Sequence, residues 1–416
     1  MTTIAESQMG IPTVESEDFY KDLDPILDEI NRKCVKMDED IKKKYVDIIN
    51  KVIESVIKAL KSTDEVFEKL FSKLEYVGSY FDGLRVAKPT EFDLNLIMKL
   101  PCDYKKIVIE NNNVSAGFVK LNILKAIQNN QQSEKVIGTV KKWCDVDGYL
   151  LENRVRQWME SVITCCLGHA TTTLSLASGE TVNIRVRKAG PAFTLNVNTG
   201  SDNIDVDLVF TIQFPESIHP PSSIRWNKDL AASWVVVPKP TNDPRFWRVS
   251  FNYSERKLTQ NQYKLKLINR FLKALRDARD LPIPSYFIKT LFLWEAHNCT
   301  MYNKPRFWEK RQGYLFIYMM NELYSNLKAR KILYYWHKGL NLFDKNKFTP
   351  DHALNMENQI SRIISKINDL IRKKDKERLR NYILALFRIS EELAIADLSL
   401  EDTTKQNEQN ISCSLS

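Results

Sequence analysis

The sequence has 416 residues, of which 43% are hydrophobic and 27% charged, and it carries a formal net charge of +9. A chain of this kind can bury a large core and is expected to form one bilobal unit or two domains. Its longest uncharged apolar runs, such as residues 314–320, fall far short of the roughly 20 residues that span a bilayer, so no membrane partner is expected. The positive charge favours an acidic partner such as nucleic acid or nucleotide.

Cysteine usage and the N-terminal sequence indicate the compartment. The seven cysteines have no regular spacing, which favours reduced thiols over a disulfide framework. The N-terminus lacks the basic start and apolar segment of a secretion signal, so we expect a cytoplasmic protein, with the nucleus as the alternative. Cys165, Cys166 and His169 suggest part of a zinc site. No further Cys or His stands at finger-like spacing, so no zinc is expected.

The N-terminal region is predicted to contain a disordered segment, residues 1–20, followed by one long helix over residues 21–60. Apolar residues recur there at helical spacing: Ile26, Ile30, Val35, Ile41, Tyr45, Ile49, Val52, Val56 and Leu60. The other face of the helix is rich in lysine and includes Lys42, Lys43 and Lys51. It either follows a phosphate backbone or is simply solvated, and the sequence leaves both interpretations open.

The stretch from Tyr76 to Leu100 has the clearest chemical pattern. Gly78 allows close backbone approach and Ser79 supplies a hydroxyl, a combination suited to binding phosphate oxygens. Glu91 and Asp93 then alternate with apolar residues, as in a half-buried strand, so both carboxylates share one face. Such a pair can hold divalent cations for phosphoryl or nucleotidyl transfer. Taken singly, a Gly-Ser pair is also typical of an ordinary turn. Two acids separated by one residue are likewise typical of the solvated face of a strand.

A later strand is predicted over residues 204–212 and supplies a further carboxylate. Its apolar residues alternate with Asp205 and Asp207, which therefore share the polar face and are expected to meet Glu91 and Asp93 across a sheet. A two-metal displacement needs more negative charge than a pair of carboxylates supplies, and Asp207 is predicted to complete the metal triad.

The C-terminal part of the chain is predicted to be helical. Residues 246–255 form an expected strand that leads into a helix, and from residue 256 the apolar spacing is helical almost throughout. The expected organisation is therefore a core with its long helix at 21–255, a helical C-lobe at 256–398 and a disordered tail at 399–416. The predicted fold class is α+β, with a mixed sheet and a helical C-lobe.

These segments together resemble the DNA polymerase beta-like nucleotidyltransferases, and within them the Mab-21 family and its cyclic GMP-AMP synthase-like receptors. The matching stretches are GSYFDGLRVAKPTEFDLNL at 78–96, VDLVFTI at 206–212, WRVSFNYSE at 247–255 and SYFIKT at 285–290. The resemblance implies a bilobal enzyme of innate immunity. It would synthesise cyclic GMP-AMP from ATP and GTP with Mg²⁺ or Mn²⁺ at a two-metal site.

The resemblance also assigns roles to individual residues. Ser79 would bind triphosphate, and the metals would be held by Glu91, Asp93 and Asp207. The remaining nucleotide contacts would come from two later segments: Arg248, Ser250 and Glu255 around the base, Tyr286 stacked on a base, and Ser285 and Lys289 near phosphate. The activating nucleic acid is expected on basic residues of both lobes: Lys42, Lys43, Lys51, Lys328, Arg330 and Lys331.

Two departures from the DNA-sensing synthase refine this expectation. Residues 255–264 contain no Cys or His where that enzyme carries its zinc module, which resembles the insect-type receptors. The implied activator is therefore double-stranded RNA, with a homodimer on RNA as a further expectation. Asn269, followed by Arg270, stands where the synthase has a phosphate-binding lysine. The alternatives are a catalytically inactive Mab-21-like RNA-binding or structural protein, and a template-independent enzyme that makes linear products.

Overall fold

The computed structural model describes residues 14–389, except for 87–89, 113, 129–131, 169–171, 176–180, 190–191, 201, 226–232, 338 and 345–348. The chain divides into two compact units. The first, here called the sheet unit, comprises residues 37–260 and 333–340. The second, here called the helical unit, contains the described residues of 14–36, 261–332 and 341–389. The predicted α+β class is confirmed.

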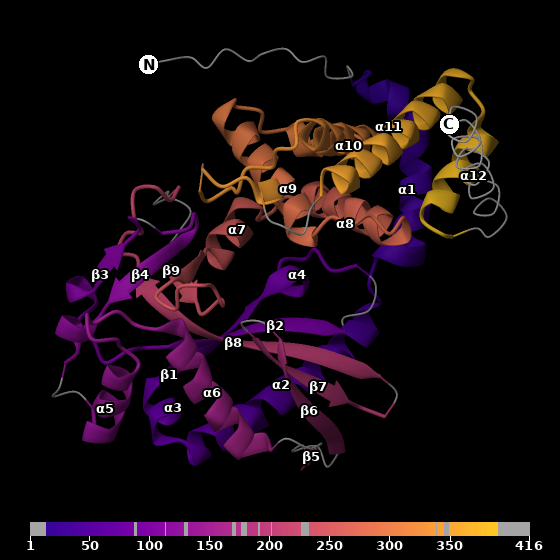
Figure 1. Ribbon diagram of the computed structural model, residues 1–416. Coiled ribbons are helices and arrows are strands. Elements are labelled where there is room, and N and C mark those ends of the chain that lie inside the picture. Colours follow the sequence, from indigo (N-terminus) through magenta and orange to yellow (C-terminus); the bar gives the residue numbers. More distant parts are fainter. Residues whose placement is uncertain are drawn as a thin grey trace, which may run out of the picture. The chain divides into compact units, whose positions relative to one another are not determined.

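The sheet unit is built on one ten-stranded mixed sheet (Figure 1). Its strands are β1 Phe71–Val77, β2 Glu91–Met98, β3 Val108–Glu110, β4 Phe118–Asn122, β5 Thr172–Ser175, β6 Thr181–Ala189, β7 Ala192–Asn198, β8 Asn203–Pro215, β9 Ser233–Val237 and β10 Trp247–Ser250. The main path runs β3-β4-β10-β9-β8-β7-β6-β5, and β2 pairs with β8 on one side and β1 on the other. The β2–β8 pair is parallel, and the pairs on either side of it are antiparallel.

The helices of the sheet unit bury the apolar stripes that the sequence pattern predicts. They are α2 Glu39–Thr63, α3 Glu65–Leu70, α4 Gly78–Phe81, α5 Glu134–Lys142, α6 Glu152–Leu167 and α7 Asn252–Leu258, with short 3-10 turns η3 Tyr104–Lys106 and η4 Leu124–Ala126. Figure 1 shows α2, α3 and α6 along one face of the sheet. Ile49, Val52 and Val56 of α2 are fully buried there, which places the lysines of α2 on its outer face.

The predicted long helix over residues 21–60 is interrupted. The chain forms η1 Glu17–Leu23, α1 Asp24–Ile30 and η2 Asn31–Val35, and α2 begins only at Glu39. Lys36 is extended, and the Asp38 carboxylate accepts hydrogen bonds from the backbone N–H groups of Asp40 (2.9 Å) and Ile41 (3.0 Å). This N-cap starts a new helix even though the apolar spacing continues on both sides of the break.

The helical unit incorporates the N-terminal segment. Its other elements are α8 Tyr263–Ala278, α9 Ser285–Met301, η5 Phe307–Glu309, α10 Gln312–Lys328, η6 Leu342–Asp344, α11 Pro350–Arg372 and α12 Lys376–Leu386. Tyr20 and Leu23 of η1 are buried, although residues 1–20 were predicted to be disordered. Gly313 of α10 lies so close that an added Cβ would be 2.5 Å from the Tyr20 carbonyl oxygen. Residues 1–13 of that prediction, and the predicted tail at 399–416, lie outside the described residues.

Ion pairs hold the N-terminal segment to the other helices of this unit. Acids of this segment pair with Arg311, the residue before α10, and with basic residues of α11 and α12. These pairs are Asp18 and Asp24 with Arg311 (3.7 and 3.1 Å), Glu15 with Arg372 (2.7 Å), Asp22 with Lys376 (2.9 Å) and Glu29 with Arg380 (2.8 Å). Residues 21–36 therefore belong with the helical unit and not with the core to which the sequence assigned them. No helix in the described ranges is both long and apolar enough to cross a bilayer.

Candidate active site

The predicted carboxylates meet on two adjacent parallel strands. In the β2–β8 register Glu91 lies beside Asp205, and Asp93 lies beside Asp207. Neighbouring residues in register on parallel strands point to the same face of a sheet, so all four acids share one face. The alternate residues of both strands, such as Phe92 and Leu208, are buried in the core. The predicted meeting of these acids across the sheet is confirmed.

Burial and mutual repulsion make this face receptive to a cation. Desolvation, reinforced by the charges of Glu91 and Asp207, raises the pKa of Asp93 to about 6. The pKa of Asp207 is also raised, mainly by burial, while a 2.5 Å hydrogen bond from the Thr194 hydroxyl lowers it. Carboxylates that repel one another in a partly buried site are stabilised in the ionised form by a bound cation. The donor set, all oxygen, is the one that Mg²⁺ and Mn²⁺ prefer.

Two arginines neutralise the outer acids of the same face. Arg85 Nη1 lies 2.5 Å from Glu91 Oε2, and Arg187 Nη2 lies 2.8 Å from Asp205 Oδ2. In the described part of the chain, no three His, Cys, Asp or Glu side chains already converge to hold a metal ion. Glu91 would have to turn from Arg85 to share an ion with Asp93. Glu91 and Asp93 lie two residues apart on the same face of β2, so a change of the Glu91 rotamer would bring its carboxylate towards Asp93.

The Gly78-Ser79 pair lies against the acids. Val77, the last residue of β1, pairs with Asp93, and the chain then turns into α4 through Gly78 at a φ of +78°. A Cβ atom on Gly78 would be 1.7 Å from Asp93 Oδ2, so a side chain is sterically excluded. Ser79 is half-buried at the start of α4. The predicted phosphate-binding pair and the predicted metal-binding acids are therefore brought together within the sheet unit.

Arg256 supports this turn and was not singled out from the sequence. Its Nη2 donates a 2.8 Å hydrogen bond to the Tyr76 carbonyl oxygen, and its Nε lies 3.4 Å from Asp82 Oδ1. Asp82 is buried and its backbone N–H donates to the Gly78 carbonyl at 3.1 Å. The partners of Arg256 lie about 180 positions away along the chain, so no local pattern marks its role. The only hint in the sequence is that Arg256 directly follows the predicted site residue Glu255.

A second cluster holds Arg248 between aromatic rings. The guanidinium carbon lies 4.5 Å from the ring centroid of Tyr334 and 5.3 Å from that of Phe118. Gly117 leaves room for it, since an added Cβ would be 2.4 Å from Arg248 Nη1. Arg248 is thereby fixed as a planar donor. Tyr334 comes from residues 333–340, whose part in this unit the sequence did not predict.

The other residues predicted near the base have different surroundings. The Ser250 hydroxyl lies 3.3 Å from Asn252 Oδ1. Glu255 is buried, and its Oε1 accepts a 2.9 Å hydrogen bond from the indole N–H of Trp336, which stacks on Phe251 with centroids 4.4 Å apart. Glu255 therefore anchors residues 333–340 to α7. Its expected contribution to a base pocket stays a prediction.

The predicted residues of the helical unit lie on α8 and α9. Ser285 is exposed at the start of α9, and Tyr286 and Lys289 are half-buried within its first turns. Asn269 is fully buried in α8, and burial lowers the pKa of its neighbour Arg270. Their nucleotide contacts stay predictions.

The basic residues predicted to bind nucleic acid differ in how freely they are presented. Lys43 is exposed, whereas Lys42 pairs with Glu39 (3.2 Å) and Lys51 with Asp47 (2.7 Å). In the helical unit Lys328 and Lys331 are exposed, and Arg330 pairs with Glu357 at 2.9 Å. Exposed ion pairs such as that of Lys42 are weak and can exchange for phosphate contacts, whereas the Arg330–Glu357 pair is partly buried. Of the zinc-like motif, Cys165 and Cys166 end α6, and His169 lies outside the described residues.

Sequence comparison gives the class of protein that this fold and site define. Residues 80–261 match the model of the Mab-21 protein nucleotidyltransferase domain. Residues 264–362 match that of the Mab-21 protein HhH/H2TH-like domain. The chain is thus a Mab-21 nucleotidyltransferase, a class of enzyme that uses divalent metal ions.

Individual relatives show to which family of Mab-21 nucleotidyltransferases the chain belongs. The chain is 31% identical to a cyclic GMP-AMP synthase-like receptor of Ctenocephalides felis, over 88% of each chain. It is 34% identical to one of Microplitis demolitor, over 83% of this chain and 65% of the relative, and 31% identical to one of Trichogramma pretiosum, over 89% and 76%. The protein belongs to the family of cyclic GMP-AMP synthase-like receptors.

Proposed function

We propose that this enzyme is a cytoplasmic sensor that, on binding long double-stranded RNA, joins ATP and GTP into cyclic GMP-AMP. The observation that carries the proposal is the register of β2 and β8, which places Glu91 and Asp93 beside Asp207, next to the Gly78-Ser79 turn. Nucleotidyl transfer needs this combination of a phosphate-binding turn and clustered carboxylates.

The residues of the sheet unit have separate parts in the proposal. Ser79 and the backbone N–H groups of its turn orient the triphosphate. Asp93 and Asp207, with Glu91, hold Mg²⁺ or Mn²⁺, which when bound would offset phosphate charge and favour ionisation of the attacking hydroxyl. Arg248, fixed between Phe118 and Tyr334, presents donors suited to N7 and O6 of guanine.

The remaining roles rest on the resemblance of the chain to its family. Ser250 and Glu255 are assigned to the acceptor base, Tyr286 to stacking, and Ser285 and Lys289 to phosphate. Activation by RNA rests on the absence of Cys and His from residues 255–264, together with surfaces rich in lysine. A-form RNA is recognised through shape, phosphates and 2′-hydroxyls, for which such surfaces suffice. A homodimer on RNA forms part of the same proposal.

The test is a product assay with purified protein, ATP, GTP and either Mg²⁺ or Mn²⁺. Double-stranded RNA or DNA of graded length is added, and the products are identified by mass and by comparison with synthetic standards. We expect cyclic GMP-AMP only with long double-stranded RNA. The variant combining Glu91→Gln with Asp93→Asn should bind RNA normally and make no product, because it removes charge from the metal site without removing packed atoms.

Other outcomes of the assay would contradict specific parts of the proposal. Linear products would indicate a template-independent transferase, and equal activation by DNA would contradict the choice of activator. Absence of product under every condition would favour a catalytically inactive protein. Full activity of the double variant would contradict the metal site.

A further inference from the structure

The sheet unit carries a cluster of exposed aliphatic side chains at one end of its sheet. Val108 of β3, Leu124 of η4 and Val146 of the loop after α5 are 53%, 40% and 96% exposed. Val108 pairs with Asn122 on β4, two residues before Leu124. An added Cβ on Gly148 would be 2.8 Å from Leu124 Cβ, so the loop of Val146 touches η4. We call these three residues the aliphatic cluster.

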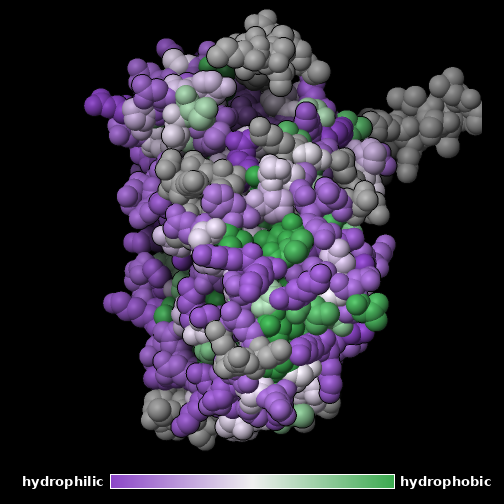
Figure 2. Space-filling view, turned by 90° about the vertical axis from the view of Figure 1, so that its left-hand side faces the viewer, coloured by the Kyte–Doolittle hydropathy of each residue, from purple (hydrophilic) through white to green (hydrophobic). Residues whose placement is uncertain are grey.

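Figure 2 shows apolar side chains gathered on the face of the molecule that bears β3 and β4, among hydrophilic ones. Scattered exposed apolar residues are ordinary on protein surfaces, but a contiguous group that protrudes marks an interaction site. A valine that is 96% exposed contributes almost nothing to the core of its own unit. Its exposed position in the loop leaves it available for an external contact.

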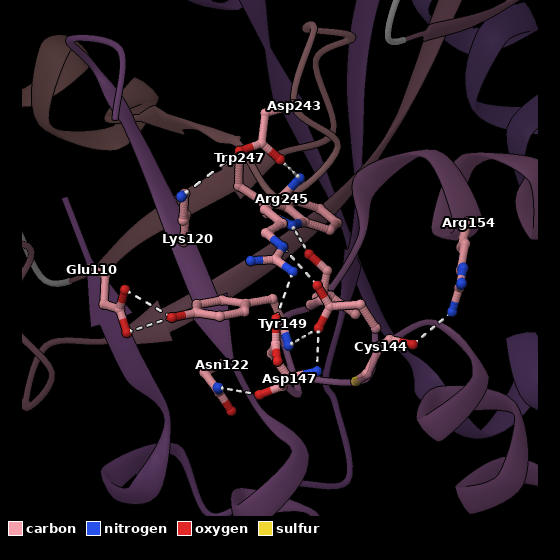
Figure 3. Close-up of polar contacts among 12 residues, drawn as sticks. Glu110, Lys120, Asn122, Cys144, Asp147, Tyr149, Arg154, Asp243, Arg245 and Trp247 are labelled. Atoms are coloured by element: carbon pink, nitrogen blue, oxygen red, sulfur yellow. Dashed lines mark hydrogen bonds and ion pairs between the residues drawn. The ribbon is translucent and has the colours of Figure 1, made fainter. Parts of the chain in front are cut away.

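The loop that presents Val146 is held rigidly. Asp145 Oδ1 accepts hydrogen bonds from the backbone N–H groups of Asp147 (3.0 Å) and Tyr149 (2.9 Å). Arg245 joins both acids, with Nε 2.6 Å from Asp145 Oδ2 and Nη2 2.8 Å from Asp147 Oδ2. The Tyr149 hydroxyl donates to the Glu110 carboxylate of β3 at 2.9 Å (Figure 3). Val146 is therefore presented on a fixed platform, which lowers the entropy lost on contact.

Lysines outnumber acids in the segments that carry the cluster, residues 103–110, 118–126 and 141–150. The exposed lysines nearest to it in the chain are Lys105 and Lys106 of η3, Lys125 of η4, and Lys141 and Lys142 at the end of α5. Within the described chain, Lys105 and Lys125 have no carboxylate within ion-pair distance. The four acids of these segments are engaged. Asp103 pairs with Lys106 at 3.6 Å, Asp145 and Asp147 pair with Arg245, and the Glu110 carboxylate accepts a hydrogen bond from the Tyr149 hydroxyl.

This chemistry distinguishes among partners. Nucleic-acid bases stack on aromatic rings, and the exposed side chains of the cluster are aliphatic. A second copy of the chain in a two-fold contact would bring the same lysines against one another. An anionic bilayer surface suits both the aliphatic side chains and the lysines. The aliphatic side chains enter the boundary between headgroups and acyl chains, and the lysines contact the headgroups.

We propose that the aliphatic cluster and its lysines form a peripheral docking surface for membranes rich in anionic phospholipid. It lies at the β3 end of the sheet, away from the acids of β2 and β8, so the enzyme can dock without covering them. The sequence alone predicted no membrane partner, because its longest apolar runs are too short to span a bilayer, and that criterion does not detect exposed residues contributed by three separate segments. A surface contact of this kind needs no spanning helix.

The test is cosedimentation of the full chain with phosphatidylcholine vesicles that contain or lack phosphatidylserine. We expect binding only to the anionic vesicles, weakening as salt rises. Val146→Asp and Leu124→Asp should each lower the partition coefficient about tenfold, the effect of losing one inserted aliphatic side chain. Lys105→Glu with Lys125→Glu should lower it comparably at low salt, and less at high salt.

Matched controls make the result specific. Leu354→Asp changes an exposed leucine of α11 in the helical unit, and Lys43→Glu with Lys58→Glu changes exposed lysines of α2; both should bind vesicles normally. Equal binding by the Val146→Asp variant and the unchanged protein, or binding without anionic lipid, would overturn the proposal. A concentration-dependent dimer, seen by light scattering and lost in Val146→Asp, would identify a contact between copies and would equally overturn it.

Discussion

At the scale of single residues, the closest packing in the site is that between Gly78 and Asp93. Sequence reasoning attributed Gly78 to close approach of a phosphate. The structure adds a second requirement, because a Cβ atom there would be 1.7 Å from Asp93 Oδ2 and the φ of +78° lies in the left-handed region. The glycine thus determines where a predicted metal-binding carboxylate stands.

Gly78→Ala is therefore expected to lower kcat/KM at least about 100-fold and to destabilise the protein by about 2 kcal/mol or more. The reason is that Asp93 must move by more than the tolerance of a two-metal site. Activity assays and denaturant unfolding measure the two effects.

Two other glycines separate the possible causes of such a loss. Gly200 has a φ of +85° with open space around it, so Gly200→Ala tests backbone strain alone and should cost about 1 kcal/mol with activity retained. Gly138 lies in α5 with no atom near its missing Cβ, and Gly138→Ala should stabilise slightly. If Gly78→Ala behaved like Gly200→Ala in both assays, the contact with Asp93 would have no catalytic consequence.

At the scale of elements, residues 333–340 position the walls of the expected base pocket. Tyr334 covers Arg248, and Trp336 stacks on Phe251 and donates to Glu255. The backbone N–H of Arg225 also donates to the Trp336 carbonyl oxygen at 2.8 Å. The segment is thereby fixed to β10 and α7 of the same unit.

Trp336→Phe keeps an aromatic ring for the stack and removes the hydrogen bond to buried Glu255. We expect a loss of about 1–3 kcal/mol in stability and a rise in the nucleotide KM that exceeds the fall in kcat, because Arg248 and α7 lose their support. Trp308→Phe is the control, since the buried Trp308 N–H has no hydrogen-bond acceptor in the described structure. Matching behaviour of the two variants would contradict a positioning role for Trp336.

How far the sequence predicts these elements depends on the range of the interaction. The alternation in β2 and β8 is local, and a period of two assigns each acid to a face, so the meeting of Asp93 with Asp207 followed from the pattern. The break before α2 left a local signal in Asp38, yet the apolar spacing continued across it and concealed it. The contacts of Arg256 and Trp336 join residues far apart in sequence, and no periodicity marks them.

At the scale of the whole molecule, the chain does not build its two units in sequence. It passes from one to the other at residues 36–37, 260–261, 332–333 and 340–341. The helical unit therefore contains the first described residues of the chain, tied by ion pairs to α11 and α12. Removing the N-terminal 36 residues would remove part of that unit's core, so tests of RNA binding are better made by changing surface charge.

The exposed face of α2 offers such a test. Lys43, Lys51 and Lys58 recur at spacings that place them on one side of a helix of 25 residues, about 37 Å long. Their conversion to Glu should weaken binding of double-stranded RNA strongly at low salt and reduce the salt slope, because each lost phosphate contact retains condensed counterions. Lysines from the segments that carry the aliphatic cluster supply a control with the same change in net charge. Changing Lys105, Lys125 and Lys141 to Glu should leave RNA binding and its salt slope unchanged. Binding isotherms over a range of salt concentrations, measured with long and short duplexes, distinguish the two variants. An equal loss in both would show that overall charge, and not the face of α2, attracts the RNA, whereas unchanged binding in the α2 variant at every salt concentration would remove α2 from the interface.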